Sequence, residues 1–239
     1  MLALAIDTAI EPAVVGVVDL AAEKTRSERI WEGGRRHTRE LAPTIREVLS
    51  EADTDLEALS LIAVARGPGS YTGVRTGVSV AKGIALALDG AVPLCGVATT
   101  SILLHKAHAT APRKPGTARL LAALPAGRSR WIWGWLNSDE PWRELETPDL
   151  VNGSLDQLVQ AANRESTLGR QPWLCADRDA NLEQGVAGLS GLCWPGRRER
   201  LRTSLTLARL ARDRLAANEW SDPESVVPSY SSSAEAVGA

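Results

Sequence analysis

Apolar and polar residues change their spacing several times along the first hundred residues. Short apolar runs bounded by turn residues are typical of buried strands, whereas apolar residues three or four positions apart are typical of helices. Strands are predicted over residues 2–7, 13–19, 24–31, 59–65 and 92–97. Helices are predicted around Leu41, Ile45, Val48, Leu49 and Ala52, over residues 71–88, and over residues 99–109. The order βββ-α-β-α-β-α indicates an α/β fold.

The second half of the chain repeats part of this pattern. Strands are predicted over residues 118–124, 130–136 and 172–177, and helices over residues 154–164 and 199–218. Between the two halves, the segment APRKPG (residues 111–116) interrupts the pattern with two prolines and a glycine. We therefore expect two lobes, residues 1–110 and residues 111–239.

Three tryptophans alternate with other residues in the predicted strand over residues 130–136. A row of aromatic rings can stack on nucleic-acid bases, but such platforms are normally interleaved with basic residues. No basic residue lies between Trp131, Trp133 and Trp135. The pattern therefore favours an apolar layer beneath a helix, with the stacking platform as the alternative.

Composition limits the classes of function. The chain has 239 residues and a net charge of −2, which does not favour direct binding of nucleic acid. The apolar runs are far shorter than a membrane span, and MLALAID reaches Asp7 too early for a signal peptide. The three cysteines, Cys95, Cys175 and Cys193, are far apart and odd in number, which indicates a reducing compartment. We expect a cytoplasmic protein.

The stretch GPGSYTGVRTG (residues 67–77) lies between a predicted strand and a predicted helix. Its spacing does not match the P-loop or the dinucleotide-binding turn GxGxxG. Small residues recur at every fourth position and would form one smooth ridge on a helix. They are Gly69, Gly73, Gly77, Ala81 and Ala85. One interpretation is tight packing of this helix on its own sheet, and the other is a loop that faces a phosphate.

Asp7 and Thr8 follow the first predicted strand. A carboxylate at the end of a strand can hold Mg²⁺ beside a phosphate, and a threonine hydroxyl can contact the phosphate. Asp7 can equally cap a turn. Together with the glycine stretch, these residues suggest a nucleotide-like loop made of Asp7, Thr8, Gly67, Gly69 and Ser70.

Other catalytic motifs find no support. His105 and His108 lie three residues apart on a predicted helix, without a carboxylate or thiol placed to complete a metal site. The sequence contains neither HExxH nor GxSxG, so neither a zinc peptidase nor a serine hydrolase is indicated.

Four segments together resemble the bacterial TsaB (YeaZ) family, which takes part in forming threonylcarbamoyladenosine in tRNA. They are LAIDTA, HTRELAPTIREVL, IAVARGPGSYTGVRTGVSVAKGIALAL and VPLCGVATTS, all within residues 1–105. The resemblance implies an actin-like fold with two ribonuclease-H-like lobes, each a mixed sheet with helices. The helix over residues 199–218 would pack back onto the N-terminal lobe.

The resemblance also implies a non-catalytic role beside TsaD, the catalytic paralogue, which holds a metal through HxxxH. Here that region reads HTREL, with His37 and Leu41, so the second ligand is missing. We expect no catalytic residue, no metal and no tightly bound cofactor, with ATP and Mg²⁺ held by partner subunits. The expected partners are a TsaD-type subunit, a TsaE-type ATPase through the complex, a second copy when alone, and tRNA only indirectly.

The resemblance further implies that the partner binds to two helices, the one that follows the HTREL segment and the one that follows the glycine stretch. The residues expected there are Leu41, Ile45, Gly73, Val74, Gly77, Val78, Ala81 and Ala85. The helix over residues 71–88 is apolar nearly all round and so needs cover on two sides. The second cover can be the partner or the C-terminal helix of the same chain. The alternative function is an actin-like phosphotransferase or ATPase that acts alone through Asp7, Thr8 and the loop amides.

Overall fold

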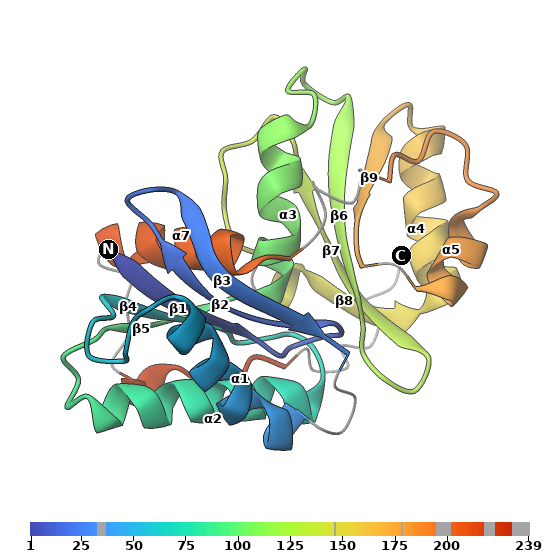
Figure 1. Ribbon diagram of the computed structural model, residues 1–239. Coiled ribbons are helices and arrows are strands. Elements are labelled where there is room, and N and C mark those ends of the chain that lie inside the picture. Colours follow the sequence, from blue (N-terminus) through green and yellow to red (C-terminus); the bar gives the residue numbers. More distant parts are fainter. Residues whose placement is uncertain (33–36, 146, 178, 195–201, 218–222, 231–239) are drawn as a thin grey trace. The chain divides into compact units, whose positions relative to one another are not determined.

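The computed structural model describes residues 1–32, 37–145, 147–177, 179–194, 202–217 and 223–230, except for the side chains of residues 37 and 38. Two compact units divide the chain (Figure 1). Unit 1 comprises Met1–Ile102 and Arg202–Ser229, and unit 2 takes most of its described residues from Leu103–Leu201. The division falls inside a helix, eight residues before the boundary expected at residue 110.

Unit 1 is built on a five-stranded mixed sheet. The strands are β1 (Leu2–Asp7), β2 (Ala13–Asp19), β3 (Lys24–Trp31), β4 (Leu61–Ala65) and β5 (Leu94–Val97), in the spatial order β3-β2-β1-β4-β5. β1, β2 and β3 pair antiparallel, whereas β4 and β5 run parallel to β1. β1 is the central strand, and its last five residues are buried because helices cover both faces of the sheet.

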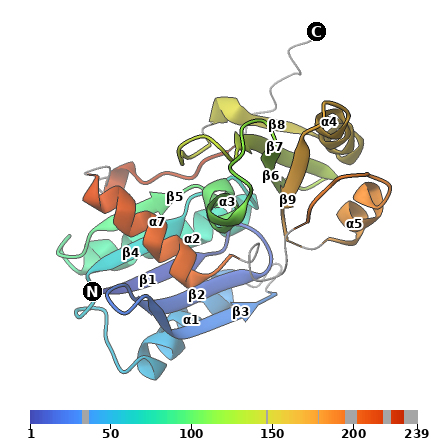
Figure 2. The ribbon, with the colours of Figure 1, turned by 90° about the horizontal axis from the view of Figure 1, so that it is seen from above.

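Three helices form the two layers around this sheet. α1 (His37–Glu51) packs on β2 and β3, and α2 (Tyr71–Ala87) packs on β4 and β1. α7 (Ser204–Ala216) crosses the opposite face and contacts β1, β2, β4 and β5 (Figures 1 and 2). Among the helices that the structure describes, none is long and apolar enough to cross a membrane.

A C-terminal segment, residues 223–229, begins with a 3₁₀ turn (Pro223–Ser225) and lies on the α2 side of the sheet. Lys82 of α2 donates a hydrogen bond to the carbonyl of Glu224 at 3.0 Å. Val226 is buried close to Gly96 of β5, and the amide of Ser229 donates to the carbonyl of Arg66 at 2.6 Å. The chain therefore covers one flank of α2 with this segment, while α7 covers the other face of the sheet.

Unit 2 repeats the same plan on a smaller scale. Its strands are β6 (Ala118–Pro125), β7 (Arg130–Asn137), β8 (Leu150–Ser154) and β9 (Gln171–Cys175), in the order β8-β7-β6-β9. β6, β7 and β8 pair antiparallel, and β9 runs parallel to β6. Its helices are the greater part of α3 (Thr99–Thr110), with α4 (Leu155–Thr167) and α5 (Ala180–Val186), and a 3₁₀ turn (Thr147–Asp149) precedes β8.

The tryptophans of β7 form part of the core of unit 2. Trp131 and Trp133 are buried in a cluster with Leu158 of α4 and Leu182 of α5, and Trp135 packs against this cluster while partly exposed. The interpretation as an apolar layer beneath helices is therefore correct for Trp131 and Trp133. Their rings are not available as a stacking platform.

The small residues of the ridge that belong to α2, namely Gly73, Gly77, Ala81 and Ala85, face inward. A Cβ atom at Gly73 would collide with the carbonyl oxygen of Thr8, and one at Gly77 would lie 2.5 Å from the Thr8 hydroxyl. Thr8 also donates a hydrogen bond to the carbonyl of Gly73 at 2.7 Å. The ridge thus allows α2 to approach the end of β1 closely, which is the first of the two interpretations of the glycine stretch.

Two glycines of α2 provide a matched test of this packing. Gly73→Ala is expected to lower the free energy of unfolding by about 1–3 kcal/mol because the added methyl meets backbone. Gly83→Ala should raise it by about 0.5–1 kcal/mol, because no described atom lies within 4 Å of a Cβ at that position. Chemical denaturation of both variants measures the difference, and equal effects would contradict the inward position of the ridge.

Candidate functional site

The end of β1 holds the carboxylate that the sequence singled out. Asp7 and Thr8 are both buried. Asp7 Oδ1 accepts a hydrogen bond from the amide of Ala9 at 3.0 Å, as a turn-capping aspartate does. Its other oxygen, Oδ2, forms an ion pair with the guanidinium of Arg202.

Arg202 lies immediately before α7, in a position that the sequence interpretation missed. Its side chain is only 2% exposed, and the ion pair with Asp7 is buried. Nη2 also donates hydrogen bonds to the carbonyl oxygens of Ile10 at 3.0 Å and Pro12 at 2.6 Å. A positive charge that belongs to the chain therefore sits where the sequence suggested Mg²⁺.

The glycine turn is joined to the same loop. The amide of Ser70 donates to the carbonyl of Ala9 at 2.6 Å, and a Cβ at Gly69 would collide with that carbonyl. Ser70 is the N-cap of α2, and its hydroxyl accepts a hydrogen bond from the amide of Gly73 at 3.3 Å. Donors that could have faced a phosphate thus bind protein oxygens.

The structure brings together all five residues of the proposed nucleotide-like loop. Asp7 ends β1 and binds the amide of Ala9, whose carbonyl accepts from Ser70 of the glycine turn after β4. Thr8 reaches α2 through its hydrogen bond to Gly73. Gly67 is closed from the other side, because a Cβ there would collide with the carbonyl oxygen of Ser229. Their arrangement is a packed junction between the β1–β2 turn and α2.

The residues expected at a partner interface need a correction. All eight are buried within unit 1: Leu41, Ile45, Gly73, Val74, Gly77, Val78, Ala81 and Ala85. They face their own sheet because the small and apolar stripe of each helix forms the core. Partner binding by these two helices stays a prediction, but the side chains available for it are others.

The outward face of α2 carries the accessible residues. Tyr71 is 59% exposed and Leu86 is 61% exposed, although both are large and apolar or aromatic. The guanidinium of Arg75 lies 4.4 Å from the centre of the Tyr71 ring. Ser79 and Gly83 are also exposed and lie one helical turn apart. This face combines an apolar end, small residues and a cation.

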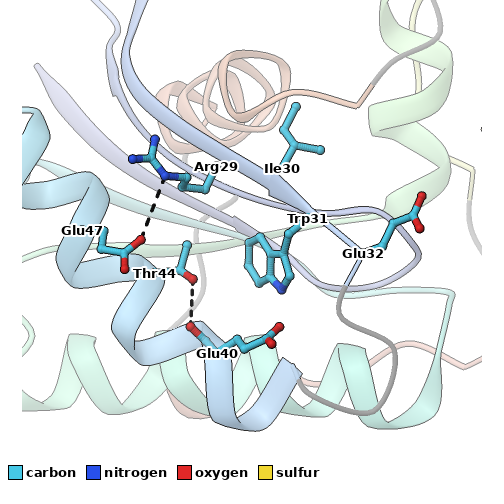
Figure 3. A pocket seen from close by; sticks show the side chains of 7 residues that line it. All are labelled: Arg29, Ile30, Trp31, Glu32, Glu40, Thr44 and Glu47. Carbon is cyan, nitrogen blue, oxygen red and sulfur yellow. Dashed lines mark hydrogen bonds and ion pairs between the residues drawn. The ribbon is translucent and has the colours of Figure 1, made fainter.

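A separate pocket of about 340 Å³ lies between β3 and α1 (Figure 3). It is lined by Arg29, Ile30, Trp31, Glu32, Glu40, Thr44 and Glu47. Figure 3 shows the Trp31 indole projecting from β3 toward α1, whereas Ile30 points away from it. None of these residues was singled out from the sequence, because the pocket arises from an edge strand meeting a helix.

The described lining of this pocket is mainly acidic. Among the residues that the structure describes, three carboxylates and one guanidinium line it, and the guanidinium of Arg29 is 4.0 Å from Glu47 while it also pairs with Glu51 outside the pocket. Hydrogen bonds from Ser27 and then from Arg29 lower the pKa of Glu51, so this carboxylate stays ionised at neutral pH. The described side chains of this pocket therefore carry more negative than positive charge.

The histidines have structural surroundings. His105 and His108 both make edge-on contacts with Trp142, and His108 Nε2 donates to the carbonyl of Glu140 at 2.9 Å. Leu41 stands where HxxxH has its second histidine, and its side chain is fully buried. The side chain of His37 lies outside the described residues.

The cysteines of unit 2 are not activated thiols. Burial, with a smaller effect of the neighbouring Cys193 thiol, raises the pKa of the Cys175 thiol. Partial burial also raises the pKa of Cys193. Because the thiolate is the nucleophilic form, neither thiol is prepared for catalysis.

The known proteins that this chain resembles have related descriptions. The family model described as "TsaD: tRNA N6-adenosine threonylcarbamoyltransferase" matches residues 28–139. The tRNA threonylcarbamoyladenosine biosynthesis protein TsaB of Escherichia coli is 33% identical over 162 residues, which are 65% of this chain and 66% of that protein. The protein of the same name from Buchnera aphidicola (subsp. Schizaphis graminum) is 28% identical over 183 residues, covering 75% and 83%.

A solved structure shares the fold over nearly the whole chain. YeaZ from Pseudomonas aeruginosa superimposes with a TM-score of 0.67 at 24% identity, covering 96% of this chain and 99% of that chain. This likeness and the two mixed sheets with their helices confirm the α/β fold class predicted from the sequence. The alignment to the E. coli protein spans just under two thirds of that protein's length.

The ion pair between Asp7 and Arg202 can be tested by a double-mutant cycle. Asp7→Ala should lower the free energy of unfolding by about 3–5 kcal/mol because it leaves a buried guanidinium uncompensated. Asp7→Ala combined with Arg202→Leu should cost clearly less than the sum of the single variants. Urea denaturation of the four proteins measures the coupling, and additive effects would contradict a direct buried pair.

Proposed function

Because the chain belongs to the TsaB (YeaZ) family of tRNA threonylcarbamoyladenosine biosynthesis proteins, we propose that it is a non-catalytic subunit of the complex that forms N6-threonylcarbamoyladenosine next to the tRNA anticodon. It supports a TsaD-type transferase by dimerising with it. The single observation that carries the non-catalytic role is the buried contact of Arg202 with Asp7.

This contact removes the groups that a nucleotide site would use. A Mg-nucleotide at the end of β1 needs a carboxylate for the metal and free amides for the phosphate. Here the carboxylate of Asp7 is neutralised by Arg202, and the amides of Ser70 and Gly73 bind oxygens of the chain. On this proposal, ATP and Mg²⁺ are held by partner subunits, and this chain holds no cofactor tightly.

The outward face of α2 is the surface proposed for the TsaD-type partner. The TsaD-type family model matches residues 28–139, a range that contains α1 and α2. Two chains with equivalent helices can pair through equivalent faces, as subunits related by a two-fold axis do. The exposed Tyr71 and Leu86 would then be buried in the complex, with Ser79 and Gly83 allowing close approach.

The proposal also covers the TsaE-type ATPase, a second copy of the chain, and tRNA. A TsaE-type ATPase would join through the complex, and the same face would pair two copies when the transferase is absent. tRNA would be contacted mainly by the other subunits, since this chain has a net charge of −2. The site of action would be the cytoplasm, where tRNA is modified.

The alternative is an actin-like ATPase or phosphotransferase that acts alone. It needs Asp7 and the loop amides to be available, and the contacts of Arg202 and Ser70 count against it. A calorimetric titration of the isolated chain with Mg-ATP separates the two functions. The scaffold predicts no saturable heat, whereas stoichiometric binding would favour the ATPase.

Gly83→Arg tests the proposed surface directly. The variant places a long charged side chain on the outward face of α2, where no described atom lies within 4 Å of the new Cβ. It should lose its complex with the TsaD-type subunit on size-exclusion chromatography, with at least a tenfold weaker dissociation constant. Its thermal stability should not fall, since arginine favours helices over glycine by roughly 0.5–1 kcal/mol.

Gly188→Arg is the matched control. Gly188 is likewise exposed, and no described atom lies within 4 Å of a Cβ at its position, but it belongs to unit 2 and follows α5. This variant should bind the TsaD-type subunit as tightly as the unaltered chain does. Retention of the complex by Gly83→Arg would remove the outward face of α2 from the interface.

A further inference from the structure

Three oxygen atoms converge on the guanidinium of Arg202. They are Asp7 Oδ2 at the end of β1 and the carbonyl oxygens of Ile10 and Pro12 in the turn between β1 and β2. The side chains of Asp7 and Arg202 are 3% and 2% exposed, so solvent takes little part in this contact. The turn therefore wraps a buried positive charge with one carboxylate and two carbonyl groups.

This set of oxygens has the chemistry of a cation site. Carboxylate and backbone carbonyl oxygens are the ligands that hard divalent cations prefer. Calcium suits these three oxygens better than magnesium does, because Ca²⁺ accepts carbonyl oxygens in irregular geometry and Mg²⁺ requires a near-ideal octahedron. Water in the space left by the side chain would supply the rest of the roughly six to eight oxygen ligands of Ca²⁺. Asp7 Oδ1 is held by the amide of Ala9 at 3.0 Å, which fixes the orientation of the carboxylate.

We propose that Arg202 takes the place of a divalent cation, and that the β1–β2 turn is a latent cation site which binds calcium or a free guanidinium ion once this side chain is removed. In the unaltered chain the positive charge is the guanidinium of Arg202, which belongs to the segment just before α7. The turn at residues 7–12 is thus completed by a residue 195 positions away rather than by an ion from solution. This inference concerns the isolated chain and does not depend on the proposed partner.

The test uses the full-length chain with Arg202→Ala, which removes the guanidinium and leaves space. Thermal unfolding is followed with increasing calcium chloride at constant ionic strength, and in parallel with methylguanidinium chloride at millimolar concentration. The midpoint should rise by about 5 °C when free calcium exceeds its dissociation constant about twentyfold. The unaltered chain should show no such shift, because its own guanidinium occupies the oxygens.

Two variants separate a specific site from a general salt effect. Arg202→Met fills the space with an apolar side chain, and the double variant Asp7→Asn with Arg202→Ala lacks the charged oxygen. Neither should respond to calcium. If Arg202→Ala is unfolded without added ions, recovery of its far-ultraviolet circular dichroism on adding calcium or methylguanidinium supports the proposal. Failure of both ions to stabilise or refold it, or an equal response in Arg202→Met, overturns the proposal.

Discussion

The buried ion pair between Asp7 and Arg202 joins the beginning and the end of unit 1. Asp7 ends the central strand of the sheet, and Arg202 precedes the helix that covers one face of that sheet. Two charges removed from water need one another and further hydrogen bonds, which the carbonyls of Ile10 and Pro12 provide. The pair fixes where α7 enters the fold, and it neutralises the carboxylate that would otherwise hold a metal.

The packing of α2 depends on the same turn. Thr8 follows Asp7 and meets Gly73 and Gly77, so the inward face of α2 is occupied by the end of β1. What remains for other proteins is the opposite face, with exposed Tyr71 and Leu86. The loop for which the sequence suggested a phosphate site is thus a structural junction. This junction holds the helix whose outer surface we propose for the TsaD-type partner.

Much of the fold could be predicted from the sequence because burial leaves a periodic pattern. The strands that contain Ile6, Val15 and Val64 are apolar runs. The start of α4 is marked by its N-cap Ser154, which forms a capping box with Gln157. β8 was missed because it is a short strand, LVNGS, that is partly exposed and not β-branched throughout.

The sequence also could not predict which face of α2 is buried against the sheet, because the small residues of α2 suit packing on its own sheet and packing on a partner equally well. The role of Arg202 escaped prediction because its partner is 195 residues away and the periodic run over residues 199–218 placed it inside a helix. α7 in fact begins at Ser204 with Thr203 as its N-cap, so Arg202 precedes the helix and its side chain turns inward.

The most direct measurement is the rate of threonylcarbamoyl transfer to tRNA by the TsaD-type subunit of the same organism, with and without this chain. The scaffold function predicts little or no product from either protein alone and a rate that rises with added chain until the two are equimolar. A TsaD-type subunit that works at full rate by itself, or product formed by this chain alone, would contradict the scaffold function.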